Sequence, residues 1–215
     1  SVNKFIFIST DKAINPTSVM GVSKRLAEIA LQEIQIRKQN STHFMAVRFG
    51  NVLGSSGSVI NIFKEQINTG GPLTVTHPDV TRYFMTVREA MGLVLESATK
   101  GSGGEIFVLD MGEPIKILDL AKEMIALSGL KEGIDIDIEF SKLKSGEKLY
   151  EEVQHLNEVH AKTDHPRIFK FLSKNNPKFT IDEIESNLRK SISNHDTYEI
   201  KSTLKNIVKE YTPAK

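Results

Sequence analysis

The amino-acid sequence predicts an α/β protein built on a doubly wound parallel sheet, together with a smaller α+β lobe. Two apolar stretches, residues 4–9 (KFIFIS) and 43–54 (HFMAVRFGNVLG), flank a long segment with helical periodicity. This strand–helix–strand order predicts a βαβ unit with parallel strands and a right-handed crossover. The composition is that of a globular chain, because 39% of the 215 residues are hydrophobic and 26% are charged.

The first strand is expected at residues 4–9, because a nearly continuous apolar run is typical of a strand buried on both faces. Natural domains rarely open on such a strand, so the chain is expected to begin partway through a domain. A helix is expected at residues 18–39, with Thr17 or Ser18 as its N-cap. Its apolar residues recur at the spacing of one buried helix face: Val22, Leu26, Ile29 and Ala30.

The later elements follow from changes in periodicity along the chain. They are a helix at 58–71, β-rich stretches at 72–87 around a turn at Pro78 and Asp79, a helix at 88–100, a buried strand at 104–112, a helix at 117–127, an alternating strand at 134–140, and helices at 181–192 and 198–211. We therefore expect three regions. They are residues 1–56, residues 57–160 (with 101–112 returning to the main sheet), and a helical extension at 161–215.

The charge and cysteine content exclude several classes of function. The formal net charge is +1, so no general field attracts nucleic acid or an anionic membrane. The chain has no cysteine, which excludes disulfides and thiolate metal sites. His77, His155 and His165 are not spaced as metal ligands, so no metal is expected. No apolar run reaches the roughly 18 residues of a membrane span, and we expect a cytoplasmic protein.

Polar residues that could carry chemistry gather in the stretch STDKAINPTSVMGVSKR, residues 9–25. Met20 and Lys24 are four residues apart and share one helix face. Thr10 stands at the carboxyl end of the first strand, where open α/β sheets bind their ligands. We expect Thr10, Asp11, Lys12 and Lys24 to converge there. In the alternative interpretation, Met20 fills a gap in the core and Lys24 is a solvated helix lysine.

Several blocks in the same order resemble the extended short-chain dehydrogenase/reductase superfamily, and most closely its nucleotide-sugar 4,6-dehydratases of capsular polysaccharide and UDP-N-acetylglucosamine type. The blocks are residues 9–25, RFGNVLGSSGSV (48–59), HPDVTRYFMTVREA (77–90), GGEIFVLDMGEPIKILDLA (103–121) and SGEKLYEE (145–152). Most of the superfamily carries a tyrosine four residues before the lysine. This chain has Met20 there, as do the larger dehydratases. The resemblance implies a Rossmann-type fold, in which residues 1–56 belong to the NAD(P)-binding domain and residues 57–160 bind a nucleotide sugar.

The resemblance also implies a reaction, the NAD(P)-dependent dehydration of a UDP-N-acetylhexosamine to a 4-keto-6-deoxy sugar nucleotide in polysaccharide or glycan biosynthesis. By the family pattern, Lys12 removes the proton from C5 and Asp11 protonates the hydroxyl that leaves C6. A thioether is a weak acceptor, so Met20 cannot take the proton of the C4 hydroxyl. Thr10 would bond that hydroxyl, with Asp11 or a water as the final acceptor. Lys24 would hold the nicotinamide ribose, and Met20 would pack against the substrate or nicotinamide.

Further ligand contacts are implied by the same resemblance. The residues expected near the cofactor are Val52, Leu53, Gly54, Ser55 and Ser56. The residues expected to bind the substrate are Asn51, Val59, Thr76, Arg82, Lys144 and Glu147. Arg82 would bind the pyrophosphate through its guanidinium fork, and Glu147 the nucleotide ribose or base. Lys144 and Ser145 stand where relatives more often have arginine and proline, so Lys144 supplies charge without a fork.

The dinucleotide fingerprint G-x-G-x-x-G is absent, because the glycine-rich stretches 54–57, 69–72 and 101–105 do not match it in its strand–turn–helix context. The chain is therefore expected to be the carboxyl-terminal half of a dehydratase, inactive alone and a homo-oligomer when whole. The choice between NAD and NADP stays open. A larger relative could carry a membrane anchor in an amino-terminal segment. Two alternatives remain: a nucleotide-sugar 4-epimerase or reductase, and a non-catalytic nucleotide-sugar-binding module.

Overall fold

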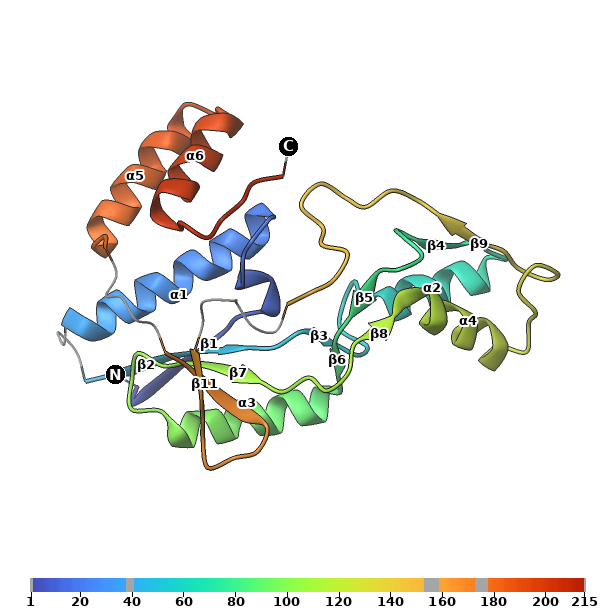
Figure 1. Cartoon of the computed structure of the whole chain (residues 1–215), viewed down its shortest axis with the longest axis horizontal. Coiled ribbons are helices and arrows are strands. Elements are labelled where there is room, and N and C mark those ends of the chain that lie inside the picture. The colour runs from blue at the N-terminus through green and yellow to red at the C-terminus, as the bar shows by residue number, and fades with distance from the viewer. Residues whose placement is uncertain (1, 38–40, 153–158, 173–177, 215) are drawn as a thin grey trace. The chain divides into compact units, whose positions relative to one another are not determined.

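The computed structural model describes residues 2–37, 41–152, 159–172 and 178–214. Its internal contacts divide the chain into two compact units. The first unit consists of Ser1–Phe49, Gly92–Asp110 and Glu152–Lys215, and the second of Gly50–Met91 and Met111–Glu151. Figure 1 labels most of the helices and strands of both. The chain thus enters each unit more than once, and each unit is described by itself.

A five-stranded sheet forms the framework of the first unit (Figure 1). Its strands, in order across the sheet, are β1 (Lys4–Ile8), β2 (His43–Arg48), β7 (Ile106–Leu109), β11 (Ile168–Leu172) and β10 (Val159–Lys162). The first three are parallel, and the last two pair antiparallel. Helix α1 (Val19–Arg37) connects β1 to β2. The predicted βαβ unit and the predicted α/β fold class are therefore confirmed.

Strand β1 is less buried than its sequence predicts. Phe5 and Ile8 are 42% and 45% exposed, whereas β7 is buried at each of its four positions. Within the described residues β1 pairs only with β2, so it is an edge strand of this sheet. The predicted burial on both faces is not observed in the described residues, where β1 has a paired strand on one side only.

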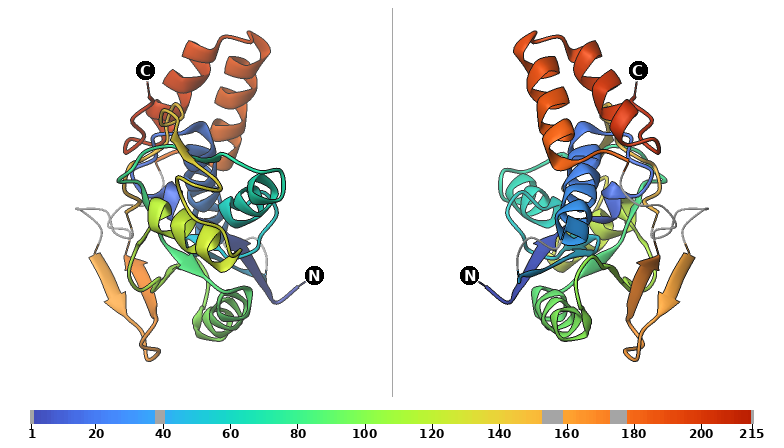
Figure 2. Two further views of the ribbon diagram at one scale, coloured as in Figure 1. Left: turned by 90° about the vertical axis from the view of Figure 1, so that its right-hand side faces the viewer. Right: turned by 90° about the vertical axis from the view of Figure 1, so that its left-hand side faces the viewer.

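Helix α1 packs against two carboxyl-terminal helices, α5 (Ile181–Ser193) and α6 (Thr197–Ile207) (Figure 2). The helix starts after Ser18, whose Oγ accepts a hydrogen bond of 3.1 Å from the Gly21 amide, as predicted for an N-cap. A hydrophobic cluster joins α1, α5, α6 and the residues after α6; its buried members are Val22, Leu26, Ile184, Leu204, Ile207, Val208 and Tyr211. Helix α6 ends at Ile207, four residues before its predicted end.

The second unit consists of helices around short strand pairs. Its elements are β3 (Asn51–Val52), α2 (Val59–Asn68), β4 (Leu73–Val75), β5 (Thr81–Arg82), β6 (Phe84–Met85), β8 (Ile115–Lys116), α4 (Ile117–Leu127) and β9 (Ile138–Phe140). The pairs β3·β6 and β4·β9 are parallel, and β5·β8 is antiparallel. Phe63, Leu73 and Ile125 lie in its buried core. Helix α3 (Val87–Lys100) begins in this unit and continues into the first.

Several other elements differ from the sequence prediction. The expected strand at 43–54 ends at Arg48, and β3 is a separate strand of the second unit. The expected strand at 134–140 is ordered as a strand only from Ile138, and Ile134 is 79% exposed. Strands β10 and β11 form a hairpin in a stretch where no strand was predicted. The functional assignment of residues 1–56, 57–160 and 161–215 stays a prediction.

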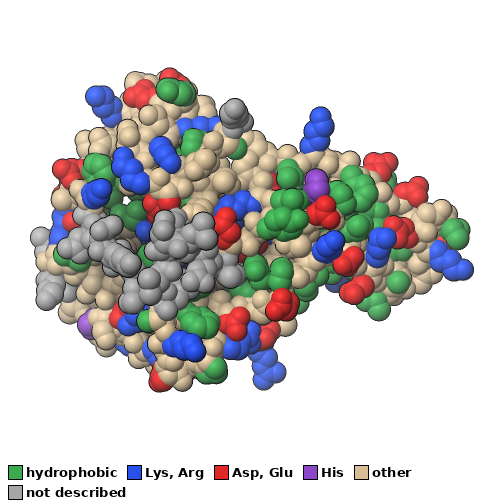
Figure 3. Space-filling model, in the orientation of Figure 1, with side chains coloured by type: hydrophobic (Ala, Val, Ile, Leu, Met, Phe, Trp, Pro, Cys, Tyr) green, Lys and Arg blue, Asp and Glu red, His purple; other side chains and the backbone are tan. Residues whose placement is uncertain are grey.

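Charged side chains of both signs are interspersed on the face of the molecule shown in Figure 3. None of the helices that the structure describes has the length and apolar character needed to cross a bilayer.

Candidate active site

The loop after β1 continues the ladder between β1 and β2. The Ser9 amide donates to the Val47 carbonyl at 2.8 Å, and the Asp11 amide donates to the Phe49 carbonyl at 3.2 Å. The chain then forms a single 3-10 turn, Asp11–Ala13, with Thr10 as N-cap; the Thr10 Oγ1 accepts from the Lys12 amide at 3.3 Å. The Thr10–Asp11–Lys12 loop is therefore held by backbone bonds at the carboxyl end of β1.

Three predicted residues meet at one carboxylate oxygen in this loop. The Thr10 hydroxyl donates to Asp11 Oδ1 at 2.9 Å, and the Lys12 Nζ lies 3.1 Å from the same atom. The Asp11 side chain is only 3% exposed. Among the residues that the structure describes, its Oδ2 is buried and has no hydrogen-bond partner. A buried carboxylate oxygen without a partner is costly, so Oδ2 is an available acceptor for a ligand hydroxyl.

Gly21, which the sequence analysis did not select, allows the first turn of α1 to approach this loop. A Cβ atom added at Gly21 would overlap the Lys12 carbonyl oxygen and lie 3.3 Å from Pro16 Cβ. Only glycine fits this contact without movement of the loop. A glycine inside a helix costs about 1 kcal/mol relative to alanine. A glycine within a predicted helix was therefore the sequence feature that could have indicated a close contact at this position.

Lys24 and Met20 lie on the part of α1 nearest the carboxyl end of β1. The Lys24 Nζ donates to the Ile8 carbonyl at 3.1 Å and lies 4.6 Å from the centroid of the Phe7 ring. These contacts hold the ammonium group at the end of the strand. The Met20 side chain is 48% exposed, so the alternative in which it fills a gap in the core is wrong.

A buried ion pair that the sequence did not reveal lies beneath the loop. The Arg48 guanidinium donates to Glu28 through Nε at 2.8 Å and Nη2 at 2.7 Å, and both side chains are fully buried. The Ser9 hydroxyl donates to the same carboxylate at 2.6 Å. Burial by itself would raise the pKa of Glu28, but the charges and hydrogen bonds of Arg48, Arg25 and Ser9 outweigh it, so the pKa lies below its ordinary value.

A second group of predicted residues meets at Glu147, in the second unit. Its carboxylate accepts from Arg82 Nη2 at 2.6 Å, from the Thr76 hydroxyl at 3.2 Å and from the Lys144 amide at 3.1 Å. The Glu147 amide donates back to the Lys144 carbonyl at 2.9 Å. The structure therefore brings Thr76 and Arg82 together with Lys144 and Glu147, although the two pairs lie more than 60 residues apart in the sequence.

Glu151 joins this group, although the sequence analysis did not select it. One of its oxygens lies 3.2 Å from Arg82 Nε, and the other accepts from Asn51 Nδ2 at 3.3 Å. Asn51 Nδ2 also donates to the Tyr83 carbonyl at 3.1 Å. Arg82 is thus bound by two carboxylates, and a phosphate group would have to take the place of one of them. The two adjacent acidic residues that end the SGEKLYEE block were the sequence feature that could have indicated Glu151.

The residues predicted near the cofactor form the turn between β3 and α2. The Leu53 amide donates to the Met85 carbonyl at 2.9 Å, and the Ser55 amide to the Val52 carbonyl at 3.3 Å. Gly54 has a φ of 74°, and its backbone faces open space, since a Cβ there would meet nothing within 4 Å. Ser55 and Ser56 are exposed. Val59, which was predicted to bind the substrate, is partly buried and packs against the hydrophobic core of the second unit.

The histidines have local structural roles. His77 Nδ1 accepts from the Asp79 amide at 3.1 Å, and His165 Nδ1 from the Arg167 amide at 3.2 Å; His155 lies outside the described residues. No cluster of three or more potential metal ligands occurs in the described part of the chain.

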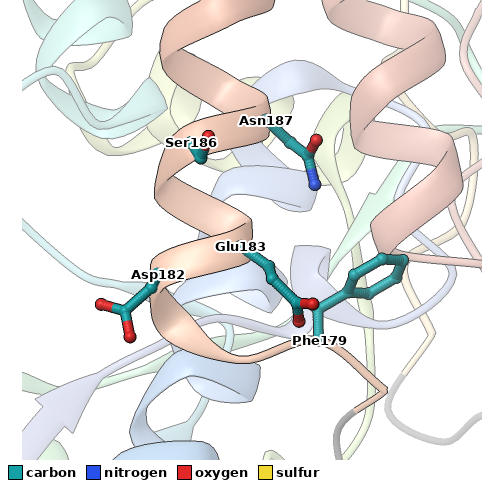
Figure 4. A pocket seen from close by; sticks show the side chains of 5 residues that line it. All are labelled: Phe179, Asp182, Glu183, Ser186 and Asn187. Atoms are coloured by element: carbon teal, nitrogen blue, oxygen red, sulfur yellow. The ribbon is translucent and has the colours of Figure 1, made fainter.

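A hollow beside α5 contains none of the predicted site residues (Figure 4). It is lined by Phe179, Asp182, Glu183, Ser186 and Asn187. The Glu183 carboxylate accepts from the Thr180 amide in a capping box, and Asp182 lies 3.2 Å from Arg37. Both carboxylates therefore serve the structure of the helix, and we assign no ligand to this hollow.

Comparison with solved structures gives the class of fold. The chain is similar to the protein Pen from Bacillus thuringiensis, with a TM-score of 0.72 and 36% identity over 80% of this chain and 54% of that one. It is also similar in fold to a dTDP-glucose 4,6-dehydratase from Bacillus anthracis, with a TM-score of 0.56 and 16% identity over 65% of this chain and 52% of that one. The predicted Rossmann-type fold is confirmed.

The chain belongs to the family of polysaccharide biosynthesis proteins, whose model matches residues 1–173. It is 57% identical to the capsular polysaccharide biosynthesis protein CapD of Staphylococcus aureus over 169 residues. This aligned region covers 79% of this chain and 28% of that protein. It is 40% identical to a UDP-glucose 4-epimerase of Rickettsia canadensis over 151 residues. This aligned region covers 70% of this chain and 43% of the epimerase. The predicted family resemblance is confirmed, and the chain spans less than half the length of these relatives.

Proposed function

We propose that the chain is the catalytic and substrate-binding part of an NAD(P)-dependent nucleotide-sugar 4,6-dehydratase that acts on a UDP-N-acetylhexosamine, with UDP-N-acetylglucosamine as the first candidate. The observation that carries this proposal is the meeting of Thr10, Asp11 and Lys12 at Asp11 Oδ1. A hydroxyl, a buried acid and an amine on one rigid turn supply the groups that a dehydration needs. The family membership and the CapD similarity support a role in polysaccharide biosynthesis.

The groups on this loop would divide the proton transfers among them. Thr10 hydrogen-bonds the C4 hydroxyl, and Asp11 accepts its proton, for which the buried Oδ2 is available. Lys12 removes the C5 proton, and Asp11 then protonates the hydroxyl that leaves C6 as water. Lys12 returns a proton to C5 when C6 is reduced. A single carboxyl group can serve twice because it is left protonated by the first step and ionised by the second. Met20 takes no part in proton transfer, since a thioether is a weak acceptor.

We propose that Lys24 and the turn at residues 52–56 contact the nicotinamide end of an NAD(P) cofactor. When bound, NAD(P) supplies the oxidation at C4 and the later reduction at C6. Lys24 presents an ammonium group at the carboxyl end of β1, where it can donate to ribose hydroxyls. Gly54 leaves an open stretch of backbone in the turn at residues 52–56. The sequence contains no G-x-G-x-x-G for the pyrophosphate, so we propose that turnover needs a dinucleotide-binding region in addition to these 215 residues.

The Glu147 group of the second unit would bind the nucleotide. We propose that Arg82 exchanges one carboxylate for the pyrophosphate, to which its planar fork can donate two hydrogen bonds. Glu147 would then be released to accept from a ribose hydroxyl. Lys144 adds a positive charge on the exposed turn next to Glu147. Asn51, already bound to Glu151, would donate to the substrate amide.

The direct test is to incubate UDP-N-acetylglucosamine and NAD(P) with the protein expressed from the complete coding sequence. We expect a product that has lost one water and carries a 4-keto-6-deoxy sugar, identified by mass spectrometry and NMR. The 215-residue chain alone serves as the comparison and is expected to give no turnover. A UDP-sugar that is bound by the complete protein but never converted would contradict the proposal and favour a non-catalytic binding module.

A nucleotide-sugar 4-epimerase is the second candidate, because the chain is 40% identical to a UDP-glucose 4-epimerase over 70% of its length. An epimerase would return a product of unchanged mass with the C4 hydroxyl inverted. It has no use for a base at C5, which makes Lys12 beside Asp11 the feature that favours dehydration. The same incubation therefore separates the two reactions by product mass.

A further inference from the structure

The carboxyl-terminal residues are bound directly to the loop that carries Thr10, Asp11 and Lys12. After α6 the chain runs back along the start of α1. There the Thr212 amide donates to the Pro16 carbonyl at 2.9 Å, and the Ala214 amide to the Thr17 carbonyl at 3.3 Å. Pro16 and Thr17 end the loop and lead into the N-cap of α1. Residues 208–214, here called the tail, lie beyond the segment that the family model matches.

A chain of charged side chains makes a second connection between the tail and the loop. The Glu210 carboxylate lies 2.6 Å from Arg25 Nε, and Arg25 Nη1 lies 3.2 Å from Glu28. The Ser9 hydroxyl donates to Glu28 at 2.6 Å. Since Ser9 directly precedes Thr10, four linked side chains join the tail to the residue before the candidate catalytic group.

Burial makes this connection stiff. The Glu28 and Arg48 side chains are fully buried, and the Arg25 side chain is 11% exposed. Both guanidinium groups also lie near the ring of Phe171, at 5.6 Å for Arg25 and 5.2 Å for Arg48. Removing one member of a buried ion pair leaves the other charge uncompensated, so the members hold one arrangement strongly.

Packing fixes the tail itself. Val208 and Tyr211 are both fully buried and lie in the same hydrophobic cluster as Val22 and Leu26 of α1. Burial also raises the pKa of the Tyr211 phenol. The amides of Thr212 and Ala214 therefore belong to a segment that is fixed by packing. Their hydrogen bonds to Pro16 and Thr17 can limit the movement of the loop.

We propose that the tail positions the Thr10–Asp11–Lys12 loop for proton transfer, with Glu210 and Glu28 as positioning residues. Its catalytic consequence rests on the function proposed above, whereas the restraint itself does not depend on any reaction. The tail acts from outside the substrate site, through the backbone bonds to Pro16 and Thr17 and through Arg25, Glu28 and Ser9.

The restraint is tested by hydrogen–deuterium exchange on the 215-residue chain. The readout is exchange of the Asp11 and Ile14 amides, which donate to the Phe49 and Asp11 carbonyls. We compare Thr212→Pro, which removes the amide donor, with Thr212→Ala, which keeps it. We expect about tenfold faster exchange in the proline variant and no change in the alanine variant, because local opening is set by the contacts that close the segment.

A second pair of variants tests the charged connection. Glu210→Ala is expected to accelerate the same two amides about tenfold, whereas Glu210→Gln, whose amide oxygen can still accept from Arg25 Nε, gives a smaller increase. Glu185→Ala is the control, because Glu185 forms an exposed pair with Arg189 on α5. If neither Thr212→Pro nor Glu210→Ala changes the exchange of the loop, the proposal is overturned, whatever reaction the protein performs.

Activity of the complete protein supplies the catalytic readout. Glu210→Ala is expected to lower kcat about 10- to 100-fold, because small displacements of catalytic groups have effects of that size. KM for the UDP-sugar should stay within about twofold, since the nucleotide-binding groups belong to the second unit. Faster exchange of the loop with an unchanged kcat would also overturn the proposal. Absence of turnover in the unmodified protein would count against the proposed function alone, and the exchange data would still decide on the restraint.

Discussion

Asp11 is the residue on which the proposed chemistry converges. Its Oδ1 accepts a hydrogen bond from the Thr10 hydroxyl and lies 3.1 Å from the Lys12 Nζ, while its Oδ2 is buried without a hydrogen-bond partner among the described residues. A solvated aspartate in a polar turn would offer both oxygens to water. In this loop Oδ2 is instead buried, and Oδ1 contacts the two groups proposed to take part in proton transfer with Asp11.

Gly21 provides a test of how closely the loop must fit. Gly21→Ala should favour the helix by up to about 1 kcal/mol on propensity. The added methyl group overlaps the Lys12 carbonyl, however, so the loop must shift. We expect turnover by the complete protein to fall about tenfold or more.

Gly92→Ala is the matched control for this prediction. Gly92 also lies in a helix, but a Cβ added there meets nothing within 4 Å. Thermal unfolding should show this variant as stable as the unmodified protein or more so, with activity unchanged. Equal activity in Gly21→Ala and Gly92→Ala would remove the argument that close packing of α1 fixes Lys12.

Arg82 gives a residue-scale prediction for the second unit. Arg82→Lys keeps the charge and loses the planar fork that bridges Glu147 and Glu151. We expect KM for the UDP-sugar to rise about 10- to 100-fold, the range for lost hydrogen bonds to a charged group. Arg189→Lys, at an exposed pair on α5, is the control. An Arg82→Lys variant with unchanged KM would exclude the pyrophosphate role.

At the scale of elements, the buried Glu28 joins β1, α1 and β2. Its pKa is lower in the folded protein than its ordinary value of 4.5. Ionised Glu28 therefore stabilises the fold at pH values above 4.5, and this contribution is lost as the pH falls through the lower folded-state pKa. Glu28→Gln should reduce the free energy of unfolding by about 3–5 kcal/mol at pH 7, because Arg48 loses its buried partner.

Denaturant unfolding at several pH values measures this effect. The difference between the unmodified protein and Glu28→Gln should be largest at neutral pH and shrink below pH 4.5. Glu185→Gln should change the stability little at any pH, since exposed ion pairs contribute about 0–1 kcal/mol. A pH-independent difference would mean that the ionisation of Glu28 is not the cause of the lost stability.

The sequence predicted elements better than it predicted their neighbours. Helix α4 has the predicted limits, and α1 begins at its predicted cap. The burial predicted for β1 is not observed in the described residues, where the strand is paired on one side only. The pairing of Glu28 with Arg48 could not be read from the chain either, since the two residues are 20 positions apart and each is an ordinary polar residue in its own element.

The candidate site shows the same division. The Thr10–Asp11–Lys12 loop is local, so the order of residues after a strand was enough to predict it. The Glu147 group depends on contacts across 65 to 100 positions, and only the resemblance to known proteins selected its members. Glu151 was missed because nothing local distinguishes it from Glu152. In the structure Glu152 belongs to the first unit and accepts a hydrogen bond from Asn15 Nδ2.

At the scale of the whole molecule, each of the two units carries its own polar group. The first unit holds the acid, the amine and the hydroxyl proposed for proton transfer, and the second holds the arginine and carboxylates proposed for the nucleotide. The chain spans 28% of CapD and 43% of the Rickettsia epimerase, so the activity of the whole protein is a proposal that rests on these two groups.

The most direct measurement is dehydration of UDP-N-acetylglucosamine by the complete protein in deuterium oxide, with and without Lys12→Ala. If Lys12 removes the C5 proton and exchanges it with solvent, the 4-keto-6-deoxy product of the unmodified protein carries deuterium at C5. Lys12→Ala should lower kcat by about 100-fold or more, within the range for loss of a general base. A product without deuterium at C5, or a Lys12→Ala variant with normal turnover, would contradict the account.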